Sequence, residues 1–372
     1  MTACGARERS KKSPGTRSKG NKNRRVMTAL GPVTLTRLNI IGAEGSSFPA
    51  DARWGLDGFL TRRASRRAIL AGLEHSFDQA RRMLQEFCGW TVDAEVVRRT
   101  THRQARRVRQ QRPEQTDTGS FTTPDEPLEV QIDAGKVNTP DGWRDFEIAM
   151  IHGRPLGLPA TPDEWSSRRL PPPTRRQVIC EIEPSELFGQ RLRQETDRLG
   201  MTAAADVTVV GDGAEWIWNL ASEQLPQAMG VPDVFHAMEH PGTVAKAVWG
   251  EGTPAQLDRL AEARLGLLER GKSGVDDWLG RAFAAASSEP ACGVVRATAV
   301  YFAKHPARLG YAERLASGRS IGSGAVEGAV KQLANRRLKR SGARWRAEHV
   351  GPLVELRAFS QSQEWHHYWA AA

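Results

Sequence analysis

The chain has few cysteines and no long apolar run, and both shortages limit its class. Of its 372 residues only four are cysteines (Cys4, Cys88, Cys180 and Cys292), and none forms a C-x-x-C pair. So few and scattered thiols exclude a disulfide framework and disfavour a thiolate zinc site, so we expect a reducing cytoplasm. No stretch of about 18 apolar residues suggests a membrane span. The charged N-terminus also lacks the apolar segment of a secretory signal.

Acidic residues are scarce in three blocks of the sequence. Residues 1–40 hold ten basic side chains and one acidic, residues 61–112 hold 13 and five, and residues 331–346 hold seven and none. Residues 113–330, in contrast, hold 21 basic and 31 acidic side chains. An acidic middle therefore lies between basic arms. Basic blocks are typical of contacts with polyanions such as nucleic acid, although solvated surface charge gives the same composition.

The order of apolar and polar residues predicts an α/β protein built from several parts. Residues 1–40 form a basic segment with almost no large apolar side chains in its first half, and we expect a disordered tail. Apolar residues at helical spacing predict a helical N-terminal DNA-binding region over residues 41–112. Residues 113–127 are rich in proline, threonine and acids and read as a linker.

Strand and helix patterns alternate in the rest of the chain. Apolar–polar alternation predicts strands over residues 128–133, 143–151 and 177–183, and a short apolar run predicts a fourth over 206–210. A helix is expected from Ser185 to about Arg198, and another over residues 214–225. These elements make residues 128–231 the first part of a mixed-sheet core. Residues 232–315 read as a mainly helical insertion, and residues 316–372 as a helical end of the core that includes a basic helix over 324–346.

Three carboxylates stand where these elements should meet solvent. Asp133 ends the first predicted strand, Asp212 follows the fourth between two glycines, and Glu327 lies in the first turn of the late helix. Neighbouring parallel strands would bring the two aspartates to one carboxyl edge, where active sites tend to form. Clustered carboxylates repel one another, and a hard cation such as Mg²⁺ relieves this repulsion. The alternative is that all three are turn, cap and helix-start charges.

A second candidate site is the H-x-x-E-H spacing formed by His236, Glu239 and His240. On one helical turn this spacing can present two zinc ligands and a general base, as in a zinc hydrolase. Pro232 and Pro241 bracket the motif, however, so we expect the helix to be short. A packing or hydrogen-bonding role for these side chains is the alternative.

The segment 318–322 fits the G-x-S-x-G pattern of a nucleophile elbow around Ser320. Such an elbow follows a core strand and needs a later acid and histidine. Residues 311–317 do not read as a core strand, and no aspartate follows Ser320. We therefore interpret this match as chance.

The basic run after Glu327 is a candidate nucleic-acid surface. Lys331 lies one helical turn beyond Glu327, and Trp345 stands between two arginines. Cations with an interleaved aromatic side chain suit phosphate contact and base stacking, whereas a buried Trp345 would make the segment structural. From this run and the other two basic blocks, the candidate DNA-binding residues are Arg24, Arg25, Arg106, Arg107, Lys331, Arg337, Lys339, Arg344 and Trp345.

Several strings in this order resemble the ISKra-type transposases of bacterial insertion sequences, which belong to the DDE class with an RNase H-like core. The resemblance covers roughly residues 128–240 and 300–369. The most specific strings are D-G-A-x-W-I-W-N at 212–219 and I-G-S-G-x-V-E-G at 321–328. The others are VQIDAGKV at 130–137, VFHAMEH at 234–240 and LVELRAFSQSQEWHHYW at 353–369.

The resemblance implies both an activity and a site. The family's two aspartates and glutamate fall on Asp133, Asp212 and Glu327, which would hold two Mg²⁺ ions, with Mn²⁺ able to substitute. The enzyme would cut DNA at the element's terminal inverted repeats and join the 3′-hydroxyl to target DNA. The helical segment between Asp212 and Glu327 would be the insertion domain, and a homodimer would form on DNA at the bacterial nucleoid. A catalytically inactive or domesticated DNA-binding relative is the rival expectation.

Overall fold

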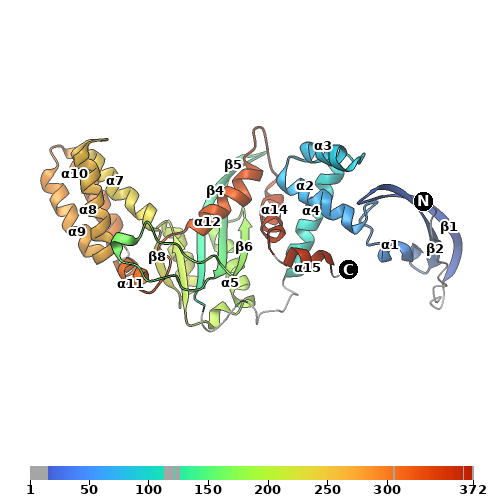
Figure 1. Cartoon of the computed structure of the whole chain (residues 1–372), viewed down its shortest axis with the longest axis horizontal. Helices are drawn as coiled ribbons and strands as arrows, with labels where there is room; N and C mark the ends of the chain where they lie inside the picture. Colours follow the sequence, from blue (N-terminus) through green and yellow to red (C-terminus); the bar gives the residue numbers. More distant parts are fainter. Residues whose placement is uncertain (1–15, 113–120, 122–125, 305, 363, 371–372) are drawn as a thin grey trace. The chain divides into compact units, whose positions relative to one another are not determined.

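The protein is described here by a computed structural model that covers residues 16–112, 121, 126–304, 306–362 and 364–370. It is a mixed α/β protein with an N-terminal three-stranded antiparallel sheet, a central five-stranded mixed sheet and a C-terminal all-helical region (Figure 1). Two compact units divide the chain. One contains the described residues up to Arg107 and from Phe359 onward, and the other runs from Val108 to Ala358. In the described part of the chain, no helix combines the length and apolarity that crossing a bilayer requires.

The N-terminal sheet corrects the expectation of a disordered tail over residues 1–40. Strands β1 (Arg17–Thr28) and β2 (Gly31–Gly42) pair antiparallel, and β3 (Gly45–Ser47) pairs with β2. Residues 1–15 lie outside the described residues. The polar composition of β1 concealed the strand, because the backbone ladder and the tight turn at Gly31 (φ 118°) form the hairpin without an apolar face. Only Val26 and Met27 of β1 are buried.

Helices fill the rest of the N-terminal unit, as expected within the predicted helical region 41–112, except that its first residues belong to strands β2 and β3. Helix α3 begins with a capping box between Ser76 and Gln79 and ends at Gly89 with φ 63°. The buried face of α2 packs with Leu84, Trp90 and other apolar side chains of this unit. The last helix of the chain also belongs here, whereas we expected residues 316–372 to complete the core. The helices are α1 (Pro49–Arg53), α2 (Arg62–Glu74), α3 (Phe77–Cys88), α4 (Ala94–Gln111) and α15 (Glu364–Ala370).

The central sheet confirms the four predicted strands and adds a fifth. Its order is β6-β5-β4-β7-β8, in which β4–β7 and β7–β8 are parallel pairs and the other pairs are antiparallel. The fifth strand, β8, has only four residues and contains a glycine and a proline, so its pattern is too short to recognise. The strands are β4 (Leu128–Thr139), β5 (Gly142–Gly153), β6 (Arg175–Glu181), β7 (Val207–Gly211) and β8 (Met229–Pro232).

Two predicted helices pack on this sheet. Helix α5 (Ser185–Arg198) and helix α6 (Glu215–Gln224) follow β6 and β7 in the chain. Phe188 and Leu192 of α5 and Ile217 of α6 form one buried core with Val130 and Ile132 of β4.

The predicted insertion is helical, and its first helix is longer than expected. Helix α7 (Val234–Trp249) continues through Pro241, which is buried within it. Pro241 removes one backbone hydrogen bond. The burial of Val234, Ala237 and Val244 on the same helix offsets this loss, so the helix continues. Helices α7 to α11 share a core with Val210 and Val231 of the sheet. The others are α8 (Pro254–Arg270), α9 (Lys272–Ala285), α10 (Glu289–Ala303) and α11 (Tyr311–Ala316).

The expected basic helix over residues 324–346 is shorter and irregular. Helix α12 (Gly324–Ala329) continues into the π-helical turn η6 (Val330–Asn335) and then α13 (Arg336–Leu338). The chain leaves the helix after Leu338 and turns at Gly342 with φ 72°. Helix α14 (Ala347–Ser360) then packs so close to β6 that a Cβ on Gly351 would lie 2.0 Å from the carbonyl oxygen of Cys180.

Candidate active site at the carboxyl edge of the sheet

Strand register brings three aspartates to the same edge of the central sheet. Gln131 of β4 pairs with Val210 of β7, and two residues further along each chain stand Asp133 and Asp212. Asp233 follows β8, which pairs in parallel with β7. Strand β4 continues past Asp133 to Thr139, so Asp133 does not end its strand as predicted, but parallel pairing with β7 ends at Gln131. The register therefore brings both aspartates to the same edge of the sheet.

A buried glutamine ties the start of α12, and with it Glu327, to this edge. The side-chain oxygen of Gln131 accepts hydrogen bonds from the backbone N–H groups of Ala325 (3.1 Å) and Val326 (3.0 Å). Both N–H groups belong to the first turn of α12; that of Val326 also donates to the backbone oxygen of Ser323 at 3.0 Å. The anchor lies on β4 two residues before Asp133, so the carboxylate of Glu327 reaches the edge where Asp133 and Asp212 lie.

Loss of this anchor should loosen α12. We expect Gln131→Leu to speed amide hydrogen exchange at Ala325 by about 5- to 150-fold, because an N–H group left without its partner costs about 1–3 kcal/mol. The effect at Val326 should be smaller, because its N–H still donates to Ser323. Gln131→Glu keeps an acceptor at the same place and should retain most of the protection. Exchange of both amides at the wild-type rate in Gln131→Leu would show that the anchor does not hold the helix.

Asp233 joins the sheet edge, α7 and the turn before α12. Its carboxylate is fully buried and caps α7 by accepting from the N–H of His236 at 2.9 Å. The other oxygen accepts from the backbone N–H and, at 2.9 Å, from the hydroxyl of Ser323. Sequence patterns did not identify Asp233, because the strand before it was not recognised. The sequence did contain one indication of its role: Asp233 precedes an apolar helical run, which is the position of a helix N-cap.

The site concentrates negative charge. Burial raises the pKa of Asp133, and the negative charges of Asp212 and Glu327 raise it further. The N–H of Ala134, 2.7 Å from the Asp133 carboxylate, and the nearby His236 act in the opposite direction. Asp212 and Glu327 therefore lie close enough to Asp133 to affect its carboxylate, but the carboxylate oxygens of these three residues do not together form a metal-ligand group within 4.8 Å among the described residues.

Among the described residues, one group offers ligand atoms that all lie within 4.8 Å of one another: Asp233, His236 and Glu327. Both oxygens of Asp233 already accept hydrogen bonds from the protein, which suits a supporting role better than direct ligation. Nδ1 of His236 lies 3.2 Å from Asp233. If Nδ1 donates there, the other ring nitrogen of His236 is left as an acceptor facing the site.

The H-x-x-E-H motif does not form a zinc site in the described structure. His236 contacts Asp233, whereas the ring of His240 stacks on Tyr301 with centroids 3.7 Å apart. Burial lowers the pKa of His240. No group of metal-ligating atoms among the described residues includes both histidines, so the geometry gives the zinc-hydrolase alternative no support.

Ser320 is a buried structural residue, in agreement with its rejection as a nucleophile. It is 2% exposed, and its hydroxyl donates to the buried carboxylate of Glu129. Arg314 donates to the backbone oxygen of Ser320 at 2.7 Å and to Thr208 at 3.3 Å. This buried network fastens the segment before α12 to strands β4 and β7.

The structure separates the predicted DNA-binding residues into exposed and structural groups. Trp345 is 6% exposed, and its indole donates to the oxygen of Leu338 at 3.2 Å. Arg337 is 3% exposed, with its guanidinium 4.6 Å from the centre of the Trp345 ring. Both predictions were wrong, because these side chains pack on each other and cannot stack on a base. The guanidinium of Arg24 already donates hydrogen bonds to the carboxylate of Asp51 and to the backbone oxygen of Gly58.

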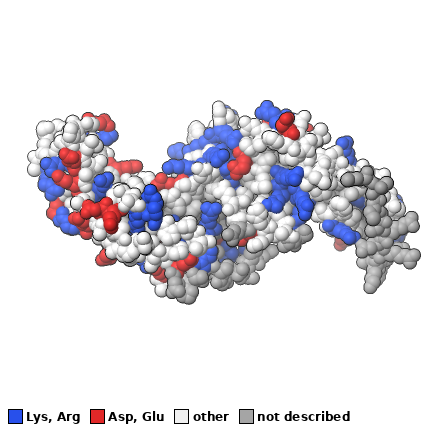
Figure 2. Space-filling view, in the orientation of Figure 1, with Lys and Arg blue, Asp and Glu red and all other residues white. Residues whose placement is uncertain are grey.

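The remaining candidates are available at the surface. Lys331 lies 3.5 Å from Glu327, and its side chain is 71% exposed. On the face shown in Figure 2, Lys and Arg side chains gather over α12 and the strands near it, whereas helices α7 to α10 show both signs. The other exposed candidates are Arg25, Arg106, Arg107, Lys339 and Arg344.

Comparison with known proteins adds no relative to this picture. No protein-family model and no curated protein matches the chain. Support for a function therefore comes from the geometry of the site and from the resemblance of its motifs.

Proposed function

We propose that the protein is a metal-dependent DNA transposase of the DDE class with an RNase H-like core. The observation that carries the proposal is the convergence of Asp133 and Asp212 at one edge of the sheet, with Glu327 tied to that edge through Gln131. The strand order β6-β5-β4-β7-β8, with an antiparallel meander followed by parallel strands, also supports an RNase H-like core.

The donor set fits a hard divalent cation. Asp133, Asp212 and Glu327 offer carboxylate oxygens, which Mg²⁺ and Mn²⁺ prefer. Burial raises the pKa of Asp133, the charges of Asp212 and Glu327 raise it further, and a cation would favour its ionised form. Bound Mg²⁺ would supply Lewis-acid stabilisation of charge on the phosphate oxygens. Asp233 and Ser323 hold the turn before α12 in place. In the proposed reaction the protein positions carboxylates around a phosphodiester and forms no covalent intermediate.

In the proposed reaction, water attacks a phosphodiester at the end of the element and releases a 3′-hydroxyl. That hydroxyl then attacks a phosphodiester of target DNA, and the strand is joined as the target's own 3′-oxygen leaves. Positioning and charge stabilisation account for catalysis in reactions of this kind. Exposed cations that follow Glu327 in the chain, such as Lys331, Lys339 and Arg344, would contact the DNA backbone.

The test is strand cleavage of a duplex that contains the element's terminal inverted repeats. We expect cleavage with Mg²⁺ or Mn²⁺ and none with a chelator, while the protein still binds the duplex in both conditions. Binding without cleavage under any divalent metal would instead identify an inactive DNA-binding relative and refute the catalytic proposal.

A further inference from the structure

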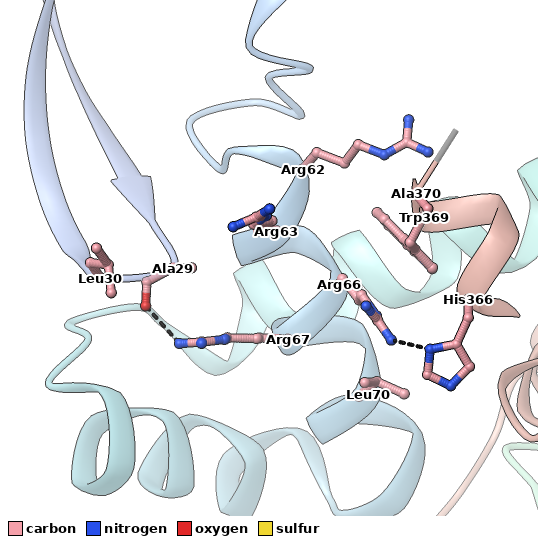
Figure 3. A pocket seen from close by; sticks show the side chains of 10 residues that line it. All are labelled: Ala29, Leu30, Arg62, Arg63, Arg66, Arg67, Leu70, His366, Trp369 and Ala370. Carbon is pink, nitrogen blue, oxygen red and sulfur yellow. Dashed lines mark hydrogen bonds between the residues drawn. The ribbon is translucent and has the colours of Figure 1, made fainter. Parts of the chain in front are cut away.

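A cavity in the N-terminal unit is lined by four arginines that have no role in the function proposed above. Its volume is about 680 Å³, and Figure 3 shows it between helix α2, the turn of the β1–β2 hairpin and helix α15. No acidic residue is among those that line it. Its lining residues include Arg62, Arg63, Arg66, Arg67, His366 and Trp369.

The arginines stand in an arrangement that disfavours the helix they belong to. Arg62 and Arg66, like Arg63 and Arg67, are four residues apart, and like charges at this spacing destabilise a helix. Arg62 and Arg63 also lie in the first turn of α2, which contains no acidic residue. Positive charge there opposes the helix dipole. An anion in the cavity would reverse both effects.

The existing contacts of these arginines leave their charge uncompensated. Arg67 donates to the backbone oxygen of Ala29 at 2.6 Å, Arg66 lies 3.2 Å from Nδ1 of His366, and Arg62 lies over the ring of Trp369. Within the part of the chain that the structure describes, none of the four forms an ion pair. The Nε atoms of Arg62 and Arg66 and the indole nitrogen of Trp369 are buried without a hydrogen-bond partner.

We propose that this cavity binds a phosphate of the DNA backbone. Guanidinium groups match the oxygens of a phosphate better than any other side chain does, and Trp369 with Leu70 offers apolar surface for the adjoining sugar or base. The assignment of DNA as the partner rests on the function proposed above, whereas the site itself does not.

A polymer fits this surface better than a free phosphate or nucleotide. The hairpin whose turn lines the cavity carries further exposed cations along β1 and no acidic side chain on either β1 or β2. A single small anion could contact only the cavity. The successive phosphates of a nucleic-acid strand could also contact the row of cations beyond it. The exposed cations of β1 are Arg17, Lys19, Lys22 and Arg25.

The experiment measures binding of the full chain to a fluorescent duplex by anisotropy, in a chelator and over a range of salt concentrations. In the double variant Arg63→Gln, Arg67→Gln, we expect the slope of log affinity against log salt to become shallower by about 2, because each lost phosphate contact removes about 0.9. The matched control, Arg81→Gln with Arg82→Gln, removes the same charge from arginines that already pair with Asp78. Its slope should stay at the wild-type value.

An unchanged slope in the cavity variant would overturn the proposal, as would equal losses in both double variants. The single variant Arg63→Gln, which alters an exposed side chain, should shift the slope by about 1 and guards against a folding defect. Cavity-dependent binding of inorganic phosphate that a DNA duplex cannot displace, or tighter cavity-dependent binding of an RNA duplex, would also refute it. Because the chelator prevents cleavage, a failure of the transposase proposal would leave this result unaffected.

Discussion

Asp212→Asn is expected to lower the rate of metal-dependent strand cleavage by at least about 10³-fold, since loss of a carboxylate ligand removes several kcal/mol of transition-state stabilisation. The same result is expected for Asp133→Asn and Glu327→Gln. The three substitutions keep size and hydrogen-bonding capacity but remove charge. The N–H of Ala214, which Asp212 accepts at 2.8 Å, can still be accepted by asparagine, so the local turn should survive.

The control for this prediction is Asp145→Asn. Asp145 lies on β5 and pairs with Lys136 at 2.9 Å, and both side chains are 65% exposed. It removes the same charge from the same sheet, and cleavage should stay within about twofold of wild type, as expected of an exposed ion pair with little energetic weight. Affinity for DNA in a chelator should not fall in any acid variant. Full cleavage by one of them would remove that residue from the site.

Sequence patterns predicted the central sheet because its strands carry recognisable runs of side chains. Residues 128–133 alternate apolar and polar side chains, and residues 206–210 form a short, mainly valine run, of which Val207–Val210 are all buried. Once β4 and β7 are parallel neighbours, Asp133 and Asp212 must reach the same edge. That part of the site needed only local patterns and one topological rule.

Other parts of the structure depend on contacts that local patterns do not encode. Asp233 acts through Ser323, which is 90 residues away in the chain. Trp345 and Arg337 pack on each other and are both buried, although both were predicted to contact DNA. Pro241 was expected to end a helix, yet tertiary packing of α7 outweighs one lost hydrogen bond. In each case a long-range contact overrides the local preference.

The site also depends on supports that lie away from it, and the clearest is a buried ion-pair network at the opposite edge strand, β6. Glu355 of α14 is 2% exposed and binds Arg109 at 2.7 Å and Arg112 at 3.2 Å, while also accepting from the N–H of Cys180. Burial alone would raise the pKa of Glu355, but Arg112 and Arg109 outweigh it, and the pKa is lowered. The network fastens α14 to β6.

Glu355→Gln should therefore lower the free energy of unfolding by about 3 kcal/mol at neutral pH, because it removes the counter-charge of the partly buried Arg112 and leaves Arg109 with Glu181 alone. Urea denaturation measures the loss, with Glu348→Gln, an exposed residue in the first turn of the same helix, as control. Since the pKa of Glu355 is lowered in the folded state, its stabilisation is complete above the unfolded value and disappears as pH falls through the folded value. The difference in unfolding free energy between wild type and variant should accordingly narrow in acid. A difference below about 1 kcal/mol at neutral pH lies within the range of surface ion pairs, and it would show that the network does not hold α14 to the sheet.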